Sequence, residues 1–183
     1  MSVRTDRDID PAPLAALLTR GVQPFVLLID GRSGAGKTVL GRELAARTGA
    51  TLVSLDEVYP GWDGLAAGGA AVEGIIRDGS WRRWDWVAGG PAATAHIDRT
   101  GSLIVEGCGA LTRASRALAD HSWWIDRDAD ERRERALRRD GDTYAPHWER
   151  WARQEDAHIA REDPEALADL IIRDGKVLTG STE

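Results

Sequence analysis

The stretch Gly31-Arg32-Ser33-Gly34-Ala35-Gly36-Lys37-Thr38 decides the fold, because it matches the pattern G-x-x-x-x-G-K-[ST] of a nucleotide phosphate-binding loop. The apolar run FVLLI at residues 25–29 precedes it and predicts a buried strand. A helical stretch follows from Lys37. Strand, glycine-rich loop and helix in this order are the context that the motif requires. The segment therefore predicts a phosphate site, and a glycine-rich turn without a ligand is the alternative.

The residues of this loop have distinct expected roles. Glycines let the backbone curl so that successive N–H groups point at the α- and β-phosphates, and the helix that begins near Lys37 adds its positive dipole end. The Lys37 ammonium is placed to reach the β- and γ-phosphates, and the Thr38 hydroxyl to ligate Mg²⁺. Lys37 is one of only two lysines in a chain with 22 arginines. The expected nucleotide contacts are Gly31, Ser33, Gly34, Ala35, Gly36, Lys37, Thr38 and Val39.

Composition and charge narrow the class of protein. A length of 183 residues suits a single domain over residues 1–183. A net charge of -6 argues against general binding to nucleic acid or to anionic membranes, so the expected partner is a small molecule. The single cysteine, Cys108, excludes an intrachain disulfide and favours a cytoplasmic protein. Residues 1–10 lack the apolar segment of a secretory signal, no run approaches the ~18 apolar residues of a membrane span, and the oligomeric state does not follow from the sequence.

Strands and helices alternate along the rest of the chain. Strands are expected at 25–30, 51–54, 103–105, 123–125 and 170–172, and helices at 11–19, 37–48, a segment ending at 76, 111–119, 129–139 and 144–162. This alternation predicts an α/β fold in which a parallel sheet lies between helices and binds ligands at the carboxyl ends of its strands. Asp30, Asp56 and Glu106 follow strand ends, where carboxylates are suited to hold Mg²⁺ through water or to accept a proton.

Segments 31–38, 54–59, 105–107 and 138–140 resemble, in order and approximate spacing, those of uridine kinase-like members of the nucleoside and nucleotide kinase group. The resemblance covers about residues 25–178. It implies the three-layer P-loop NTPase fold, with a five-stranded parallel sheet of order 2-3-1-4-5 and a small helical lid at about residues 132–150. It further implies Asp56 as the carboxylate that takes the proton of an acceptor hydroxyl. Tyr59 would belong to the substrate pocket, and Glu106 would contact the substrate or a metal-bound water.

The acceptor side departs from this resemblance. Uridine kinases usually carry an Asp-His-Pro segment shortly after the tyrosine, whereas residues 60–64 here read PGWDG and include Trp62. The segment SWRRWDW at residues 80–86 is a candidate replacement, because its tryptophans offer stacking faces, Arg83 a forked donor and Asp85 an acceptor. The alternative is that Trp81, Trp84 and Trp86 pack the helical layer. Trp123 and Trp124 are expected to pack inside a strand.

Five arginines lie within the eight residues from 132 to 139, namely Arg132, Arg133, Arg135, Arg138 and Arg139. In nucleotide kinases the element after the fourth strand is a lid whose arginines neutralise the transferring phosphoryl group. The resemblance makes Arg139 the preferred candidate, and a solvated Glu/Arg surface helix is the alternative. The four histidines show no metal-ligand spacing.

These observations predict an ATP-dependent phosphotransferase that transfers the γ-phosphoryl group to a hydroxyl of a small molecule, with a nucleoside as the expected acceptor. The catalytic candidates are Lys37, Asp56 and Arg139, and those for Mg²⁺ are Thr38, Asp56 and Glu106. A kinase for another metabolite or for a nucleoside monophosphate, and a regulatory P-loop ATPase switch, are the alternatives. A guanine-specific switch is disfavoured, because its N-K-x-D element needs an asparagine and this chain has none.

Overall fold

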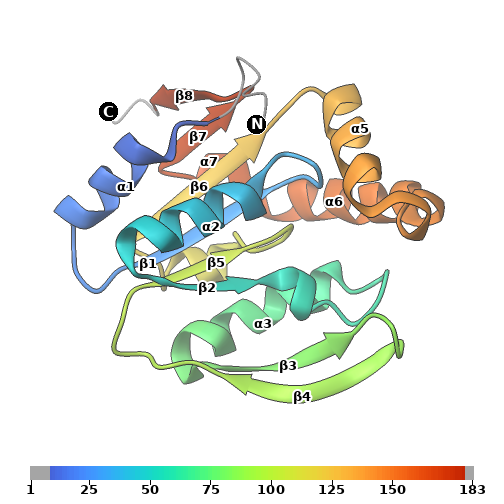
Figure 1. Cartoon of the computed structure of the whole chain (residues 1–183), viewed down its shortest axis with the longest axis horizontal. Helices are drawn as coiled ribbons and strands as arrows, with labels where there is room; N and C mark the ends of the chain where they lie inside the picture. The colour runs from blue at the N-terminus through green and yellow to red at the C-terminus, as the bar shows by residue number, and fades with distance from the viewer. Residues whose placement is uncertain (1–8, 180–183) are drawn as a thin grey trace.

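A six-stranded sheet forms the centre of the molecule (Figure 1). The computed structural model describes residues 9–179. The prediction that residues 1–10 are not a secretory signal therefore falls almost entirely outside the described residues. The strands of this sheet are β1 (Val26–Gly31), β2 (Thr51–Ser54), β5 (Leu103–Glu106), β6 (His121–Asp126), β7 (Leu170–Arg173) and β8 (Lys176–Thr179). They are ordered β2-β5-β1-β6-β7-β8, and the first five are parallel, whereas β8 runs antiparallel to β7.

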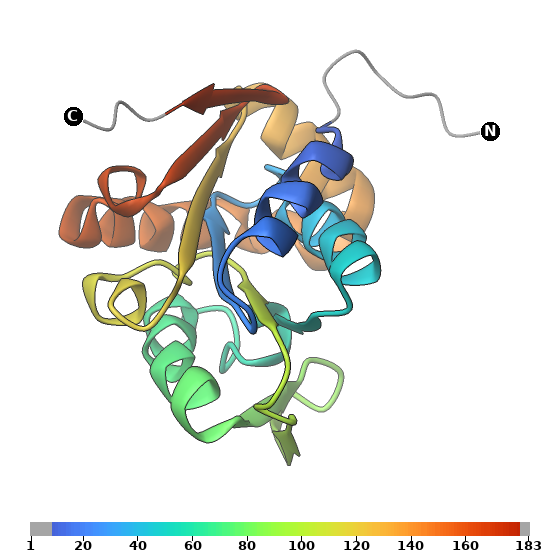
Figure 2. The ribbon, with the colours of Figure 1, turned by 90° about the vertical axis from the view of Figure 1, so that its left-hand side faces the viewer.

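Helices cover both faces of this sheet. The α-helices are α1 (Pro11–Arg20), α2 (Lys37–Thr48), α3 (Leu65–Asp78), α4 (Arg113–Arg116), α5 (Ala129–Asp140), α6 (Trp148–Glu162) and α7 (Pro164–Leu167). Three short 3-10 helices are η1 (Leu55–Glu57), η2 (Gly141–Thr143) and η3 (Ala145–His147). Helices α1 and α2 lie on one face of the sheet, and α3, α4 and α6 lie on the other (Figure 2). This is the predicted three-layer α/β architecture.

Successive residues of the central strand β1 pack into two different cores. Leu27 and Ile29 belong to the core under α1 and α2, whereas Leu28 belongs to the core under α3 and α6. All three side chains are fully buried, because alternate residues of a strand point to opposite faces and helices cover both faces here. The apolar run before the phosphate loop therefore fills both interiors.

The order of the five parallel strands confirms the predicted arrangement 2-3-1-4-5, since β5, β6 and β7 correspond to the third, fourth and fifth predicted strands. The predicted number of strands is wrong, because β8 adds a sixth strand at the edge beside β7. Asp174 and Gly175 have φ angles of 49° and 77° and form a two-residue turn that leads the chain back antiparallel. An Asp-Gly pair between two short apolar runs is typical of a β-hairpin, so the sequence contains a signal for β8 that the predicted five strands do not include.

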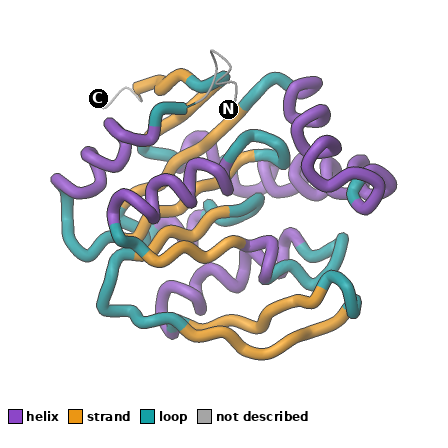
Figure 3. Tube along the Cα trace, in the orientation of Figure 1, coloured by secondary structure: helices purple, strands orange, loops and turns teal. Residues whose placement is uncertain are grey.

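Residues 80–96, for which no strand was predicted, form an antiparallel hairpin of β3 (Ser80–Asp85) and β4 (Gly90–His96). This hairpin is separate from the central sheet and lies beside α3 (Figures 1 and 3). Its register shifts between Arg82 and Trp84, so the strand carries an irregularity in the middle of its tryptophan-rich segment.

Two predicted helices have different bounds in the structure. The helix expected at 111–119 is only the four-residue α4, which the Thr112 hydroxyl caps. The helix expected from residue 144 begins at Trp148, after the turns η2 and η3, and Pro146 lies at the start of η3. The segment predicted as a lid thus comprises most of α5, these two turns and the first residues of α6. Within residues 9–179 there is no helix with the length and apolarity that crossing a membrane requires.

Candidate active site

The phosphate loop connects the end of β1 to the start of α2 and is held by close backbone approach. Gly34 has a φ angle of 82°, and a Cβ atom there would lie 2.1 Å from the carbonyl oxygen of Arg132. Gly31 is restricted in the same way by the carbonyl oxygen of Ile125. A side chain at either position would displace the loop, so these glycines of the motif are required by its shape.

The amino end of α2 opens into a large cavity. Helix α2 begins at Lys37, Gly36 is its N-cap with a φ angle of 106°, and no side chain caps it. The first amides of a helix have no partner within the helix, so they and the helix dipole are available to an anion. Gly36, Lys37, Thr38 and Val39 all line a cavity of about 720 Å³. An uncapped helix end beside a lysine and a threonine is therefore open to a ligand.

Lys37 is held near carboxylates and a thiol. Its Nζ donates to the carbonyl oxygen of Arg32 at 3.0 Å and lies 3.5 Å from the Sγ of Cys108. Burial lowers the pKa of Lys37, but Cys108, Glu106, Glu155 and other nearby acidic groups raise it by more, so the net shift is upward. Lys37 therefore carries its positive charge at neutral pH.

Glu106 brings a second oxygen group to the start of α2. Its carboxyl group is 1% exposed and accepts a hydrogen bond of 3.0 Å from the Thr38 hydroxyl. Burial raises the pKa of Glu106, although Lys37 and the hydroxyls of Ser54 and Thr38 oppose this shift. Hydroxyl and carboxylate oxygens are the ligand type that Mg²⁺ prefers. In the described part of the chain, no three His, Cys, Asp or Glu side chains are grouped so as to hold a metal ion.

The same cavity is lined by residues from five further segments, and it brings together most of the predicted acceptor residues. Asp56, Tyr59, Trp62, Glu106 and Arg139 all line it, together with Trp84 and Trp86 of the hairpin. Asp56 lies in η1, directly after β2, and its carbonyl oxygen accepts a hydrogen bond of 2.7 Å from the indole Nε1 of Trp86. The candidate proton acceptor is thus fixed to the hairpin through its backbone.

Tyr59 connects the acceptor side to the loop after β5. Its hydroxyl donates to the carbonyl oxygen of Cys108 at 2.8 Å, and its ring is 2% exposed. Burial, with contributions from Cys108, Asp56 and other acidic groups, raises the pKa of Tyr59 well above its usual range. Tyr59 therefore remains protonated and acts as a hydrogen-bond donor.

Trp62 is the centre of a group of aromatic rings. Its ring is stacked with that of His147 at 4.3 Å and with that of Tyr144 at 5.4 Å between centroids. The ring of Trp86 lies 4.8 Å away, tilted by 55°. Trp84 lies close by, since a Cβ atom at Gly61 would be 3.6 Å from its ring. The segment PGWDG is therefore part of an aromatic wall.

Two predicted substrate residues lie away from this cavity. Arg83 pairs with Glu57 at 3.0 Å, and the carboxylate of Asp85 accepts the amides of Val87 and Ala88 at 2.8 and 2.9 Å. Neither Arg83 nor Asp85 is among the residues that line the cavity. Trp84 of β3 and Trp86 of the turn after it line the cavity, whereas the neighbouring charged side chains are engaged by Glu57 and by amides of the turn.

The tryptophans of residues 80–86 were expected either to contact the acceptor or to pack the helical layer, and each expectation applies to some of them. Trp81 packs against the core under α3, as the packing alternative expected, whereas Trp84 and Trp86 line the cavity. Trp123 and Trp124 are buried in β6, as predicted. Trp151 of α6 both belongs to the core and lines the cavity.

Two predicted nucleotide contacts shape the loop without lining the cavity. Gly31 makes the close approach described above, and Ala35 is fully buried. The carbonyl oxygen of Ala35 accepts a hydrogen bond of 3.0 Å from the Nε of Arg127. The other predicted loop residues all line the cavity: Ser33, Gly34, Gly36, Lys37, Thr38 and Val39.

The arginines of α5 have different surroundings. Arg139 lines the cavity, and its Nε and Nη2 donate to the two carboxylate oxygens of Asp140 at 2.8 and 2.7 Å. Arg132 is buried and donates to the carbonyl oxygen of Ser33 at 3.4 Å, so it supports the phosphate loop from behind. Arg138 pairs with Glu134 on the surface, as the alternative of a solvated helix expected. The cluster is therefore divided between the cavity, the loop and solvent.

Asp30 is a structural tie, in contrast to the metal or proton role considered for it above. Its Oδ1 accepts the amides of Gly31 and Gly109 at 2.6 and 3.0 Å. Its Oδ2 accepts the amide of Leu111 at 2.9 Å and lies 3.1 Å from the Nε2 of His158. These partners saturate the buried carboxylate and join the end of β1 to the loop after β5 and to α6.

Glu155 of α6 is a site residue that sequence reasoning missed. Its carboxylate is 3% exposed, accepts the amide of Ser33 at 2.7 Å and lies 3.4 Å from the Sγ of Cys108. Burial raises the pKa of Glu155, although the amide of Ser33 and the charge of Lys37 oppose the shift. The available signal was its spacing, because Trp151, Glu155 and His158 recur on one face of a helix.

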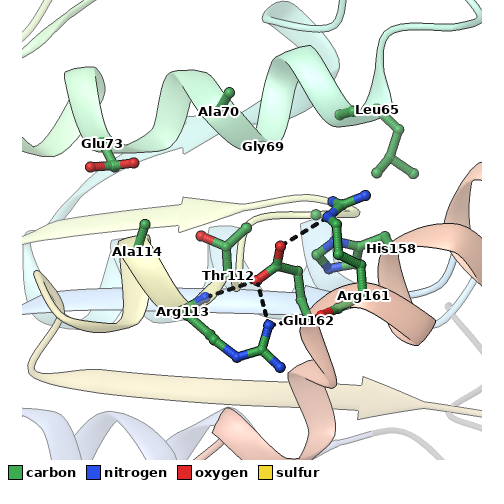
Figure 4. A pocket seen from close by; sticks show the side chains of 12 residues that line it. Leu65, Gly69, Ala70, Glu73, Thr112, Arg113, Ala114, His158, Arg161 and Glu162 are labelled. Carbon is green, nitrogen blue, oxygen red and sulfur yellow. Dashed lines mark hydrogen bonds and ion pairs between the residues drawn. The ribbon is translucent and has the colours of Figure 1, made fainter.

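A second, smaller cavity of about 270 Å³ lies between α3, α4 and α6 (Figure 4). Arg113 and Arg161 both pair with Glu162 there, at 3.6 and 2.9 Å. No residue of the phosphate loop lines it. Its two arginines are both paired with Glu162, so neither is a free cation for a phosphate group.

The fold and the loop together define the class of protein. A glycine loop followed by Lys and Thr lies between the first strand and its helix, at the carboxyl edge of a parallel sheet of order 2-3-1-4-5, and this combination is the P-loop NTPase fold. No family model matches this sequence, and no curated protein matches it.

Solved structures show the more particular relationship. The chain is similar to a possible uridine kinase from Bacillus stearothermophilus, with a TM-score of 0.61 and 16% sequence identity over 88% of this chain and 96% of that chain. It is also similar to a candidate fructose transport system kinase from Silicibacter sp. TM1040, with a TM-score of 0.57 and 17% identity over 86% of this chain and 91% of that chain. These similarities confirm the P-loop fold that the sequence resemblance implied.

Proposed function

We propose that this protein transfers the γ-phosphoryl group of ATP to a hydroxyl group of a small molecule, with a nucleoside as the expected acceptor. The observation that supports this proposal is a single cavity of about 720 Å³ that joins the uncapped start of α2, with Lys37 and Thr38, to the carboxylate-bearing residue Asp56. A phosphate site alone would serve a switch. A carboxylate across the same cavity gives the second reactant a place.

In the proposed reaction the triphosphate lies against the first amides of α2, and Lys37 neutralises the β- and γ-phosphates. Thr38 and Glu106, whose oxygens lie 3.0 Å apart, would hold Mg²⁺, with Asp56 as a further candidate reached through water. The ion would supply charge neutralisation of the phosphates.

Asp56 orients the acceptor hydroxyl and takes its proton as the new oxygen–phosphorus bond forms and the bond to the leaving ADP breaks. Arg139 is the arginine of the predicted lid that lines the cavity, and it offers a cation to the transferring group. A cytoplasmic location, which the single cysteine favours, belongs to the same proposal.

The decisive experiment measures acceptor-dependent ADP release over a panel of hydroxylated metabolites, for the parent protein and for Asp56→Asn. We expect Asp56→Asn to lower kcat by roughly 10²–10⁴-fold, because general-base catalysis contributes about this much, and to leave the affinity for ATP unchanged. Asp78→Asn, the same change at an exposed position on α3, is the matched control.

Two results would contradict the proposal. Near-normal turnover of Asp56→Asn with its best acceptor would remove the base assignment. ADP release that no acceptor stimulates would favour the regulatory ATPase.

A further inference from the structure

The acceptor half of the cavity is lined by aromatic side chains that come from three separate segments. Trp62 precedes α3, Trp84 and Trp86 belong to β3 and the turn after it, and Tyr144 lies between η2 and η3. Large aromatic side chains are normally covered by protein, yet the Trp86 side chain is 39% exposed in a cavity wall. Such a wall offers flat apolar faces to a ligand directly beside Asp56.

Charge in this cavity does not favour an anionic acceptor. Among the described residues that line the cavity, four are carboxylates, namely Asp56, Glu57, Glu106 and Asp140, and three are cations, namely Lys37, Arg42 and Arg139.

Two of these cations are assigned to other groups, and the third, Arg42, belongs to the helix that begins in the phosphate loop. Lys37 belongs to the phosphate loop, and Arg42 is on α2, one turn beyond Thr38. Arg139 already donates to both carboxylate oxygens of Asp140. A phosphate group on the acceptor would therefore meet the carboxylates of Asp56 and Glu57. The cation beside Glu57, Arg83, is already paired with it at 3.0 Å and does not line the cavity.

We propose that the acceptor is an alcohol that carries a flat aromatic or heteroaromatic ring and has either no charge or a positive charge, and that Trp84 and Trp86 of the hairpin determine this specificity. Tryptophan faces bind apolar rings by stacking and bind cations through the ring quadrupole, so both kinds of acceptor fit this wall. Phosphorylated acceptors, including nucleoside monophosphates, and ring-free polyols are excluded. This inference rests on the proposed function and specifies its substrate class.

The first test compares acceptors in matched pairs with the parent protein. The pairs are uridine and uridine 5′-monophosphate, cytidine and cytidine 5′-monophosphate, and pyridoxine and pyridoxine 5′-phosphate, with glycerol as the ring-free alcohol. For at least one pair, we expect kcat/KM for the alcohol to exceed that for its phosphate ester, and that for glycerol, by at least tenfold. Stimulation by the phosphate esters or by glycerol to the same extent would overturn the inference and leave the kinase function intact. Failure of every acceptor to stimulate ADP release would contradict the proposed function itself.

The second test addresses the hairpin with the best acceptor of that panel. Trp84→Leu should raise KM for the acceptor about tenfold, with KM for ATP and kcat within about threefold of the parent, because it removes a stacking face and leaves the phosphate loop untouched. Trp84→Phe keeps an aromatic face and should retain KM within about threefold. Val87→Ala, at a fully exposed position just beyond β3, is the matched control. An unchanged acceptor KM in Trp84→Leu, or equal losses in the Leu and Phe variants, would show that the wall does not select the acceptor.

Discussion

The two halves of the cavity are built in different ways. The phosphate half is one continuous segment, residues 31–39, whose shape depends on glycines and whose expected ligands are backbone amides. The acceptor half consists of side chains from η1, the turn before α3, the hairpin and the turns after α5. The difference shows that binding a common nucleotide can be encoded by one short motif, whereas selecting an acceptor depends on side chains that only the tertiary fold brings together.

The largest expected effect breaks the phosphate half alone. Lys37→Ala should lower phosphoryl transfer by on the order of 10³-fold and weaken ATP binding, because it removes the buried cation that faces the phosphates. The control is Lys176→Ala, because Lys176 is the other lysine of the sequence and lies at an exposed position of β8. This variant should change neither phosphoryl transfer nor ATP binding. Calorimetry would measure ATP binding by both variants. An ATP affinity equal to that of the parent in Lys37→Ala would contradict the proposed role of the loop.

A pair of glycine substitutions compares the rigidity of the two halves. Gly34→Ala should destabilise the protein by about 2–4 kcal/mol, because its Cβ would lie 2.1 Å from the carbonyl oxygen of Arg132 in addition to the strain of a positive φ. Gly89→Ala, in the hairpin turn, has a φ of 66° but no atom within 4 Å of the added Cβ, so it should cost only about 1 kcal/mol. Thermal unfolding would measure both, with roughly 2–4 °C in Tm expected per kcal/mol. Equal losses would show that the close approach at Gly34 relaxes easily.

A smaller effect should be confined to the acceptor half. Trp86→Phe removes the indole donor that bonds to the carbonyl oxygen of Asp56 at 2.7 Å, and a net loss of about 1 kcal/mol corresponds to roughly fivefold in kcat. The KM for ATP should not change. Trp81→Phe is the control, because the Nε1 of Trp81 has no hydrogen-bond partner among the described residues. If steady-state kinetics gave the two variants the same kcat, the Trp86 bond would have no part in placing Asp56.

The smallest predicted effect concerns Glu155 and depends on pH. Burial raises the pKa of this carboxyl in the folded protein above the ordinary value of about 4.3, so its contribution to stability falls as the pH rises from that value through the raised pKa. Glu155→Gln has no such loss. The difference in stability should therefore grow with pH in favour of the variant and level off above the folded pKa. Glu149→Gln, at an exposed position of the same helix, should show no such trend in unfolding experiments across this pH range. A constant difference between Glu155→Gln and the parent would contradict the raised pKa.

The sequence predicted best what depends on local patterns. The apolar run before Gly31, the glycine loop and the alternation of elements predicted the parallel sheet between helices, and the resemblance supplied the order of its parallel strands. The short motifs placed Asp56, Tyr59 and Glu106 around one cavity. Each of these signals is contained in a few consecutive residues.

Other features could not be derived in this way. Buried and exposed residues do not alternate regularly in β3, because only Trp81 and Trp84 are partly covered among residues 81–85. The register also shifts between Arg82 and Trp84. The sequence of the hairpin therefore lacks the two-residue hydrophobic period that predicts a strand. The contact between Glu155 and the Ser33 amide joins residues 122 positions apart. The structural role of Asp30 could not be predicted either, because the amides that it binds, at Gly109 and Leu111, follow a different strand and lie far away in the sequence.

The hydrogen bonds of Asp30 have a consequence for ligand affinity. Three amides and an imidazole immobilise the residue from which the phosphate loop departs, before any nucleotide arrives. Association with a ligand normally loses free energy when flexible backbone becomes ordered. In this protein the ordering of Asp30 is part of folding, so fixing the start of the loop adds nothing to the free energy lost when a nucleotide binds.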